Sequence, residues 1–146
     1  MTDKSIIRQI FSVEEIESII GAVPDVVASL HDRVVLSDYC RKIAESADNF
    51  VLFHAGDLKA FVSIYANDKR DLIAFITQIA CMRGERNKGY GSQLLEFISV
   101  HAAEKGMKKL RLEVAIDNTS ARKFYLKHGF TEIERTDQGI FMEKHL

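Results

Sequence analysis

The sequence has few of the residues that organise disulfide-rich, metal-clustered or membrane-spanning proteins. Its two cysteines, Cys40 and Cys81, are too few for a disulfide framework or a metal-binding cluster, so we expect no metal site and a reducing, cytoplasmic location. The longest strictly apolar runs, such as 72–76, have about five residues, whereas a bilayer span needs roughly 20. We therefore expect no membrane partner.

The chain also lacks an excess of charge of either sign. Its 20 Lys and Arg residues face 21 Asp and Glu residues, which leaves a net charge of −1. Binding to nucleic acid calls for a basic surplus, so we expect no nucleic-acid partner. The first ten residues, MTDKSIIRQI, show no apolar core of a secretory signal.

Proline is nearly absent and the eight glycines are unevenly placed. The single proline, Pro24, ends the first predicted helix, and no Pro/Gly/Ser-rich linker, repeat or low-complexity tract divides the chain. Hydrophobic residues make up 47% of the 146 residues, enough for one core at this length. The sequence therefore predicts one domain over residues 1–146.

The first half of the chain predicts helices followed by an antiparallel meander. A short apolar segment, 5–10, is a candidate strand, and Ser12 with Glu15 has the pattern of a capping box at the start of a helix. A second helix is predicted after Ser37, and the stretch 25–36 before it fits helix or loop. From residue 49 the period changes, and strands are predicted at 51–54, 59–65 and 72–82.

The second half predicts alternating helices and strands. The pattern favours a helix at 92–105, a strand at 108–116, a helix at 117–128 and a hairpin of 130–135 with 140–143. Since a helical crossover joins the strands at 72–82 and 108–116, they should be parallel neighbours. A mixed α/β architecture follows, with helices on the faces of one sheet.

A glycine-bearing loop connects the strand at 72–82 to the next helix. In the segment 86–92, RNKGYGS, two glycines allow a sharp turn and the amides of the helix start can face an anion. The pattern matches neither a P-loop, which needs Lys and Ser/Thr after its second glycine, nor a dinucleotide fingerprint, which needs glycine where Leu94 stands. Spacing alone fits a phosphate site and an ordinary turn equally well.

Two blocks of this half resemble the GCN5-related N-acetyltransferase (GNAT) superfamily. Residues 79–82 followed by Arg86-x-x-Gly89-x-Gly91 are similar to its acetyl-CoA signature after the fourth strand. Residues 112–130 are similar to its fifth strand and following helix through Leu112-Glu113-Val114, Asn118, Ala121, Tyr125 and Gly129-Phe130. Asn87 stands where the family often has glycine, a mild departure because asparagine tolerates left-handed backbone.

The resemblance implies a fold and a cofactor. The fold would be a mixed, mostly antiparallel sheet of about six to seven strands flanked by about four helices, with two splayed parallel strands forming the cofactor cleft. Acetyl-CoA would be the cofactor. Its pyrophosphate would meet, mostly through the backbone, the residues Arg86, Asn87, Lys88, Gly89, Tyr90, Gly91 and Ser92. Its pantetheine arm would run along the backbone of Ile79 and Cys81, with Asn118 on the other side and the Cys81 thiol inert.

The resemblance also implies catalytic roles. Tyr125 resembles the tyrosine that acts as general acid toward the sulfur, although its apolar stripe alone fits a core aromatic. Glu113, in a Leu-Glu-Val context, is similar to the catalytic base of ribosomal-protein N-terminal acetyltransferases, and a water relay is the alternative. His54 and Glu85 are weaker candidates for the base.

The expected activity is transfer of an acetyl group from acetyl-CoA to a primary amine of a small molecule, an amino sugar, a peptide or a protein, directly within a ternary complex. The alternatives are transfer to oxygen, transfer of a longer acyl chain, and a coenzyme-A-binding module without turnover. Acceptor choice would fall to residues 21–39 and 135–140, whose acidic side chains favour a cationic amine but also fit solvated surface. The sequence is also compatible with a homodimer.

Overall fold

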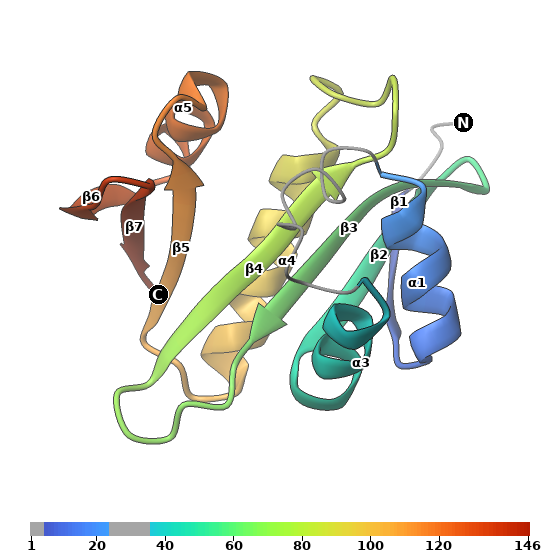
Figure 1. The fold of residues 1–146 in the computed structure, drawn as a ribbon, viewed down its shortest axis with the longest axis horizontal. Coiled ribbons are helices and arrows are strands. Elements are labelled where there is room, and N and C mark those ends of the chain that lie inside the picture. The colour runs from blue at the N-terminus through green and yellow to red at the C-terminus, as the bar shows by residue number, and fades with distance from the viewer. Residues whose placement is uncertain (1–4, 24–35) are drawn as a thin grey trace.

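The computed structural model describes residues 5–23 and 36–146, which form one seven-stranded sheet and four helices (Figure 1). The strands are β1 (Ser5–Ile10), β2 (Asp48–His54), β3 (Asp57–Tyr65), β4 (Ile73–Cys81), β5 (Lys109–Ala115), β6 (Thr131–Arg135) and β7 (Gly139–His145). The helices are α1 (Val13–Gly21), α3 (Leu36–Ser46), α4 (Tyr90–Glu104) and α5 (Thr119–Lys127). Pro24 and the undecided segment 25–36, apart from Leu36 in α3, lie outside the described residues.

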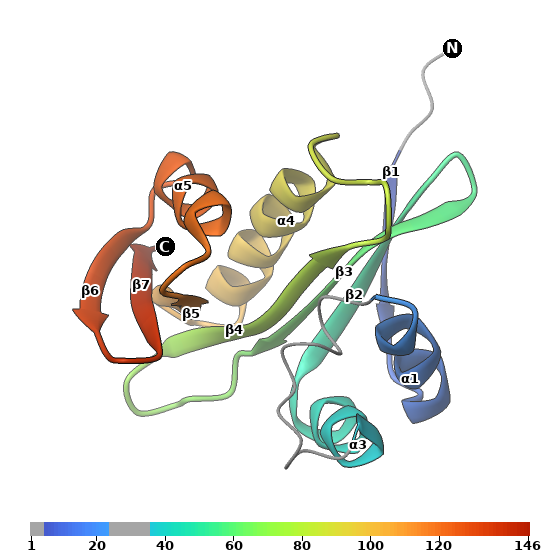
Figure 2. The same ribbon diagram turned by 45° about the horizontal axis from the view of Figure 1, so that its top comes forward.

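The sheet is mixed and mostly antiparallel, with the strand order β1-β2-β3-β4-β5-β7-β6. Only the central pair β4 and β5 is parallel, because α4 carries the chain across the sheet between them. Figure 2 shows α4 and α5 on one face and α1 and α3 on the other. The predicted fold class and the parallel pairing of these two strands are confirmed.

Several predicted boundaries are wrong by two or three residues, including those of β2, α4 and α5. The strand predicted at 51–54 begins at Asp48, because buried Asn49 donates from its Nδ2 to the carbonyl oxygen of Ile43 at 2.8 Å and so fits inside the sheet. Helix α4 begins at Tyr90 instead of residue 92, after Gly89 turns the chain. Helix α5 begins at Thr119 instead of residue 117, since Asn118 caps it.

Each face of the sheet has its own core, which follows from the alternation of side chains along the strands. Val51 and Phe61 are fully buried beneath α1 and α3, while Leu52 and Val62 are fully buried beneath α4. Helix α4 contributes Leu94, Leu95, Ile98 and Ala102 to its side. Complete burial of each such large aliphatic side chain stabilises the fold by about 1.5–3 kcal/mol, so these two cores fix the strands on which the site is built.

The parallel strands β4 and β5 separate after three residue pairs. The ladder between β4 and β5 runs from Ile73 opposite Lys109 to Phe75 opposite Arg111 and then ends, and Figure 1 shows the two strands diverging toward their carboxyl ends. A bulge lies just beyond, because Ile64 of β3 pairs with Ile76 and the preceding residue pairs with Gln78. Thr77 is therefore the extra residue of β4.

Candidate active site

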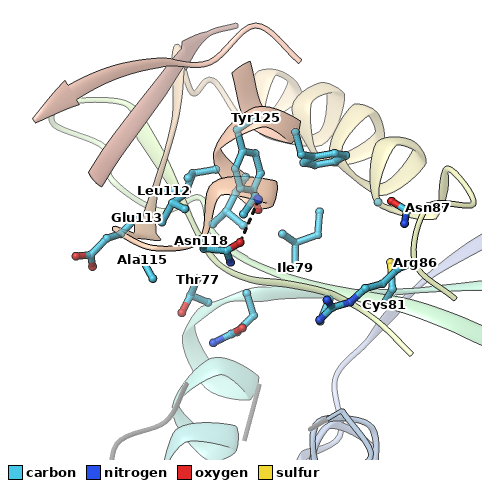
Figure 3. A pocket seen from close by; sticks show the side chains of 17 residues that line it. Thr77, Ile79, Cys81, Arg86, Asn87, Leu112, Glu113, Ala115, Asn118 and Tyr125 are labelled. Carbon is cyan, nitrogen blue, oxygen red and sulfur yellow. Dashed lines mark hydrogen bonds between the residues drawn. The ribbon is translucent and has the colours of Figure 1, made fainter. Parts of the chain in front are cut away.

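A cavity of about 720 Å³ lies between the separated halves of β4 and β5 (Figure 3). Strand β4 forms one wall, β5 and α5 form the other, and the loop before α4 closes one end. The predicted site residues that line it are Ile79, Cys81, Arg86, Asn87, Gly91, Glu113, Asn118 and Tyr125. Sequence segments far apart in the chain thus meet in one cavity of a size typical of small-molecule sites.

The loop before α4 presents a helix start without a side-chain cap. Asn87 and Gly89 have φ angles of 64° and 86°, in the left-handed region, and Gly89 is the N-cap residue of α4 with no side-chain hydrogen bond to the helix. Asparagine thus takes the conformation for which the family often uses glycine. The first amides of a helix carry partial positive charge, so this end of the cavity favours an anionic group.

The loop's basic side chains are organised around one carboxylate. Glu85 accepts from Nζ of Lys59 at 3.0 Å and from Nζ of Lys88 at 3.1 Å, and these hydrogen bonds hold the pKa of Glu85 below its usual value. Lys88 therefore lies against Glu85 and is not among the lining residues, whereas Arg86 is. Of the predicted basic contacts, Arg86 is the one that the fold brings to the cavity.

The remaining predicted loop residues lie beside the cavity. Tyr90 is buried in the core, with its ring 5.6 Å from the His54 ring, and Ser92 Oγ lies 2.9 Å from Nε2 of His128 at the end of α5. Burial, followed by the charges of Lys127 and Lys144, lowers the pKa of His128, so the imidazole is neutral near pH 7. Because the Tyr90 side chain is buried in the core, any contact of Tyr90 with an anion would come from its backbone.

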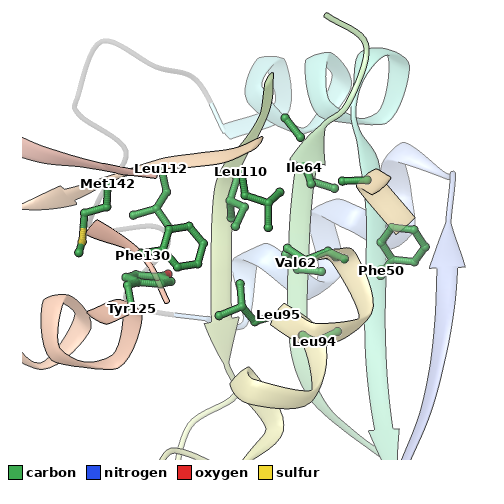
Figure 4. Packing of buried hydrophobic residues seen from close by; sticks show 14 of the residues in the cluster. Phe50, Val62, Ile64, Leu94, Leu95, Leu110, Leu112, Tyr125, Phe130 and Met142 are labelled. Carbon is green, nitrogen blue, oxygen red and sulfur yellow. The ribbon is translucent and has the colours of Figure 1, made fainter. Parts of the chain in front are cut away.

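Tyr125 lines the cavity and also belongs to the hydrophobic core beneath α4. Its side chain is 8% exposed, and its ring lies 5.5 Å from Phe130 and 5.2 Å from Phe124 (Figure 4). Burial raises the pKa of Tyr125, and the neighbouring Cys81 raises it further. The phenol is therefore protonated at neutral pH, which suits a proton donor and excludes a phenolate base.

Cys81 lines the cavity with a half-buried free thiol. Burial raises the pKa of the thiol, the amide of Gly91 lowers it in part, and Glu85 raises it again. The sulfur is therefore a thiol at neutral pH, and the thiolate is the form that attacks carbonyl carbon. The raised pKa suits an inert side chain, and that role stays a prediction.

Glu113 lies on the opposite face of β5 from the core residues Leu112 and Val114. Its side chain is exposed, and a Cβ atom at Gly139 would lie 2.6 Å from Glu113 Oε2, so the absence of a side chain in β7 makes room for the carboxylate. Figure 3 shows the carboxylate directed away from Tyr125. The two predicted proton-transfer groups are thus on different sides of the sheet, and the base role of Glu113 stays a prediction.

Asn118 reaches the cavity from the β5 side as the N-cap of α5. Its Oδ1 accepts from the amide of Ala121 at 3.1 Å, the dashed line in Figure 3. This bond fixes the side chain at the cavity wall where the resemblance places it. Capping and lining are therefore performed by one residue.

Thr77, Gln78 and Phe124 are among the lining residues that sequence reasoning did not assign to the site. Thr77 and Gln78 enter the cavity wall through the bulge in β4, and a strand's alternation carries no signal for an inserted residue. The ring of Phe124 lies 3.4 Å from where a Cβ of Gly91 would stand, so Gly91 allows α5 to pack against α4. The apolar stripe of α5 was the available signal for Phe124.

Comparison with known proteins identifies this arrangement. The model of the acetyltransferase (GNAT) family matches residues 11–130. The chain belongs to this family. It is accordingly an acyltransferase enzyme of the GNAT type, as predicted, and the loop before α4 lies where the family's signature was recognised.

Two solved GNAT structures share the whole fold. PaiA N-acetyltransferase from Thermoplasma acidophilum, solved in complex with coenzyme A, superposes with a TM-score of 0.75 at 18% identity, over 98% of this chain and 99% of that one. Ard1 from Thermoplasma volcanium superposes with a TM-score of 0.75 at 27% identity, over 97% of each chain. The fold is therefore shared from end to end.

A curated sequence relative is matched over a shorter stretch. The uncharacterized N-acetyltransferase YycN of Bacillus subtilis (strain 168) is 38% identical over 61 residues, which is 42% of this chain and 39% of that protein. The chain thus matches about two fifths of the length of this relative. Among residues 5–23 and 36–146, no helix is long and apolar enough to cross a membrane, and no group of three metal-ligating side chains is found.

Proposed function

We propose that the protein transfers the acetyl group of acetyl-CoA to a primary amine, with both substrates bound at once. The observation that carries this proposal is the opening between β4 and β5, which joins the two faces of the sheet at a helix start that favours an anion. A donor can then bind from the face of α4 and α5 while an acceptor approaches from the face of α1 and α3. The whole chain would act as one domain.

The residues present fit acetyl-CoA. Past Phe75, the edge of β4 that faces β5 has no ladder partner in that strand, so backbone groups of Ile79 and Cys81 can bond an extended amide-bearing arm. The amides at the start of α4 and the Arg86 side chain suit a pyrophosphate. Acetyl-CoA supplies the acetyl group as a thioester, which is activated toward amines.

Residues of this chain would carry out two proton transfers. Tyr125, buried and protonated, is the group that would donate a proton to the departing sulfur. On the other face, Glu113 or a water relay to bulk solvent would accept the proton that the ammonium group of the acceptor loses. The opposite placement of these two groups suits a reaction in which one proton leaves on each side of the sheet.

We expect the acceptor to be a primary amine. The exposed carboxylate of Glu113 at the open face favours a cationic group before deprotonation. Because Cys40 and Cys81 are both free thiols, we also place the enzyme in the reducing cytoplasm.

Release of coenzyme A thiol, followed with a panel of amines, tests this function. The panel should contain a small diamine, an amino sugar and a peptide with a free amino terminus, with acetyl-CoA in excess. The proposal predicts amine-dependent thiol release and an equal amount of N-acetylated product by mass spectrometry. Binding of acetyl-CoA without release for any acceptor would indicate a binding module, and release only with alcohols or longer acyl donors would assign another acyltransferase activity.

A further inference from the structure

The bulge in β4 is held from outside the sheet by one tyrosine. Tyr39 of α3 places its hydroxyl 3.1 Å from Oγ1 of Thr77, the extra residue of the bulge, and also interacts with the side chain of Gln78. Burial raises the pKa of the Tyr39 phenol, so the group is a protonated hydroxyl that can both donate and accept. A single side chain of α3 thus contacts both polar residues of the bulge.

The bulge occupies the position where β4 stops pairing with β5. The last β4–β5 pair is Phe75 with Arg111, and Thr77 and Gln78 are the next polar residues along the cavity wall. A bulge leaves its strand locally unpaired and redirects the side chains that follow it. Its orientation therefore determines which polar groups of β4 face the opening.

The side of the sheet on which Tyr39 lies is the acceptor side under the proposed function. Tyr39 packs with the cluster beneath α1 and α3, whereas Tyr125 and the start of α4 belong to the cluster on the other face. Glu113 also points away from the Tyr125 face. An amine approaching the opening from this side would meet Thr77 and Gln78 in the orientation set by Tyr39.

We propose that Tyr39 and Thr77 form a clamp that positions the bulge of β4 for the acceptor amine, making Tyr39 a positioning residue for acceptor binding. This inference rests on the proposed function and concerns the acceptor half of the same site. Tyr39 acts through Thr77 and Gln78, without itself touching the reacting atoms. The clamp also joins α3 to the strand that lines the cavity, so a shift of α3 would be transmitted to the acceptor wall.

Two isosteric variants test the clamp by kinetics. Tyr39→Phe and Thr77→Val each remove one side of the bond, and each should raise the KM for the acceptor about fivefold to tenfold while the KM for acetyl-CoA stays unchanged. The double variant should be no worse than Tyr39→Phe alone, because the bond that Thr77→Val removes is already lost in Tyr39→Phe. Tyr65→Phe is the matched control, since it removes a half-buried tyrosine hydroxyl from the same face that forms no hydrogen bond with β4 within residues 5–23 and 36–146.

The kinetic result separates a positioning role from a structural one. Wild-type kinetics in Tyr39→Phe and Thr77→Val would overturn the clamp. Equal rises in both KM values, accompanied by a fall in Tm that Tyr65→Phe shares, would overturn it as well, because general loosening would then explain the effect. A selective rise in the acceptor KM that the double variant does not exceed would support it.

Hydrogen–deuterium exchange of the β4 peptide 73–81 tests the clamp independently of turnover. We expect faster exchange in Tyr39→Phe and Thr77→Val than in the wild type and in Tyr65→Phe. If the wild-type enzyme acetylates no amine of the panel, the proposed function fails, and this measurement still decides the clamp. Unchanged exchange in both variants would overturn it.

Discussion

Burial of Tyr125 in the core is what suits it to proton donation, because the hydroxyl stays protonated in the cavity at neutral pH. Tyr125→Phe keeps the ring and its packing against Phe130 but removes the proton. We expect kcat to fall by about 10²-fold or more, which is the range of general acid catalysis, with the Kd for acetyl-CoA unchanged. Steady-state kinetics and calorimetric titration measure the two quantities.

The Tyr65→Phe variant controls for loss of a tyrosine hydroxyl elsewhere and should keep wild-type turnover. Should Tyr125→Phe also turn over at the wild-type rate, Tyr125 would be a core aromatic alone, as its apolar stripe by itself allows.

Glu113 can be separated from a water relay by pH dependence. A catalytic base must be deprotonated, so the rate falls as the pH drops through its pKa and produces an acidic limb. If Glu113 is the base, Glu113→Gln removes this limb and lowers kcat, which pH profiles of kcat/KM for both proteins would reveal. Glu134→Gln, an exposed carboxylate of β6 outside the cavity, is the control. An acidic limb that survives in Glu113→Gln assigns proton removal to water.

Single residues differ in how well the sequence predicts their surroundings. Asn87 was expected to take the left-handed conformation and does, because that preference is local. The predicted backbone contact of Lys88 with a phosphate stays a prediction, but its side chain lies against Glu85, which in turn binds Lys59 from a distant strand. Such long-range pairing depends on how β3 is placed beside the loop, which no local pattern encodes.

At the scale of elements, the start of α4 is the feature on which donor binding depends. Gly89 has a φ of +86° at this N-cap, and Gly106 has a φ of +89° beyond the far end of the same helix, each with open space where a Cβ would stand. Valine at either position is strained by more than about 1–2 kcal/mol, the cost of left-handed backbone for an ordinary residue. The two substitutions therefore impose similar backbone strain but lie at opposite ends of α4.

Gly89→Val should lose the thermal stabilisation that acetyl-CoA confers, whereas Gly106→Val should retain it. A ligand at 100 times its Kd stabilises a protein by about 2.7 kcal/mol, well within the range of a thermal shift assay. Equal stabilisation of both variants by acetyl-CoA would refute the assignment of this loop to the pyrophosphate.

Element order and pairing were predictable, while the details that shape the cavity were not. The apolar spacing of α4 and its place between two strands indicated a parallel crossover, and β4 and β5 are indeed parallel. The bulge at Thr77 and its contact with Tyr39 could not be predicted, since the same residues fit an unbroken alternating strand. The pairing with β3 decides where the extra residue falls, and that is a tertiary effect.

At the scale of the whole molecule, the sheet consists of two parts joined by a short ladder. Strands β5, β7 and β6 are attached to the rest of the sheet through three registered pairs between β4 and β5. Within this part, buried Glu143 of β7 accepts from Arg111 of β5 at 2.6 Å and lies 3.4 Å from Nζ of Lys109. These contacts hold β5 against β7. The opposite edge of β5, which faces β4, has no ladder partner in β4 beyond Arg111 and stays open along the cavity.

Glu143 makes the stability of this part depend on pH. Burial would raise its pKa, but Arg111 and Lys109 outweigh burial and hold the pKa below the usual value. Because the pKa is lowered on folding, its contribution is complete above about pH 4.5 and is lost as the pH falls through the lowered value. Glu143→Gln should therefore unfold more easily at pH 7 by about 1.5–3 kcal/mol, and urea denaturation should show that difference shrinking below about pH 4. A difference that stays constant down to pH 3 would argue against this role.

The central claim, direct transfer between two substrates bound in one opening, is tested by initial rates measured with acetyl-CoA and the amine varied together. We predict double-reciprocal lines that intersect, because both substrates are bound before transfer, and the same pattern in Cys81→Ala, because the thiol takes no part. Parallel lines, together with loss of turnover in Cys81→Ala, would show an acyl-enzyme on that cysteine and contradict the account.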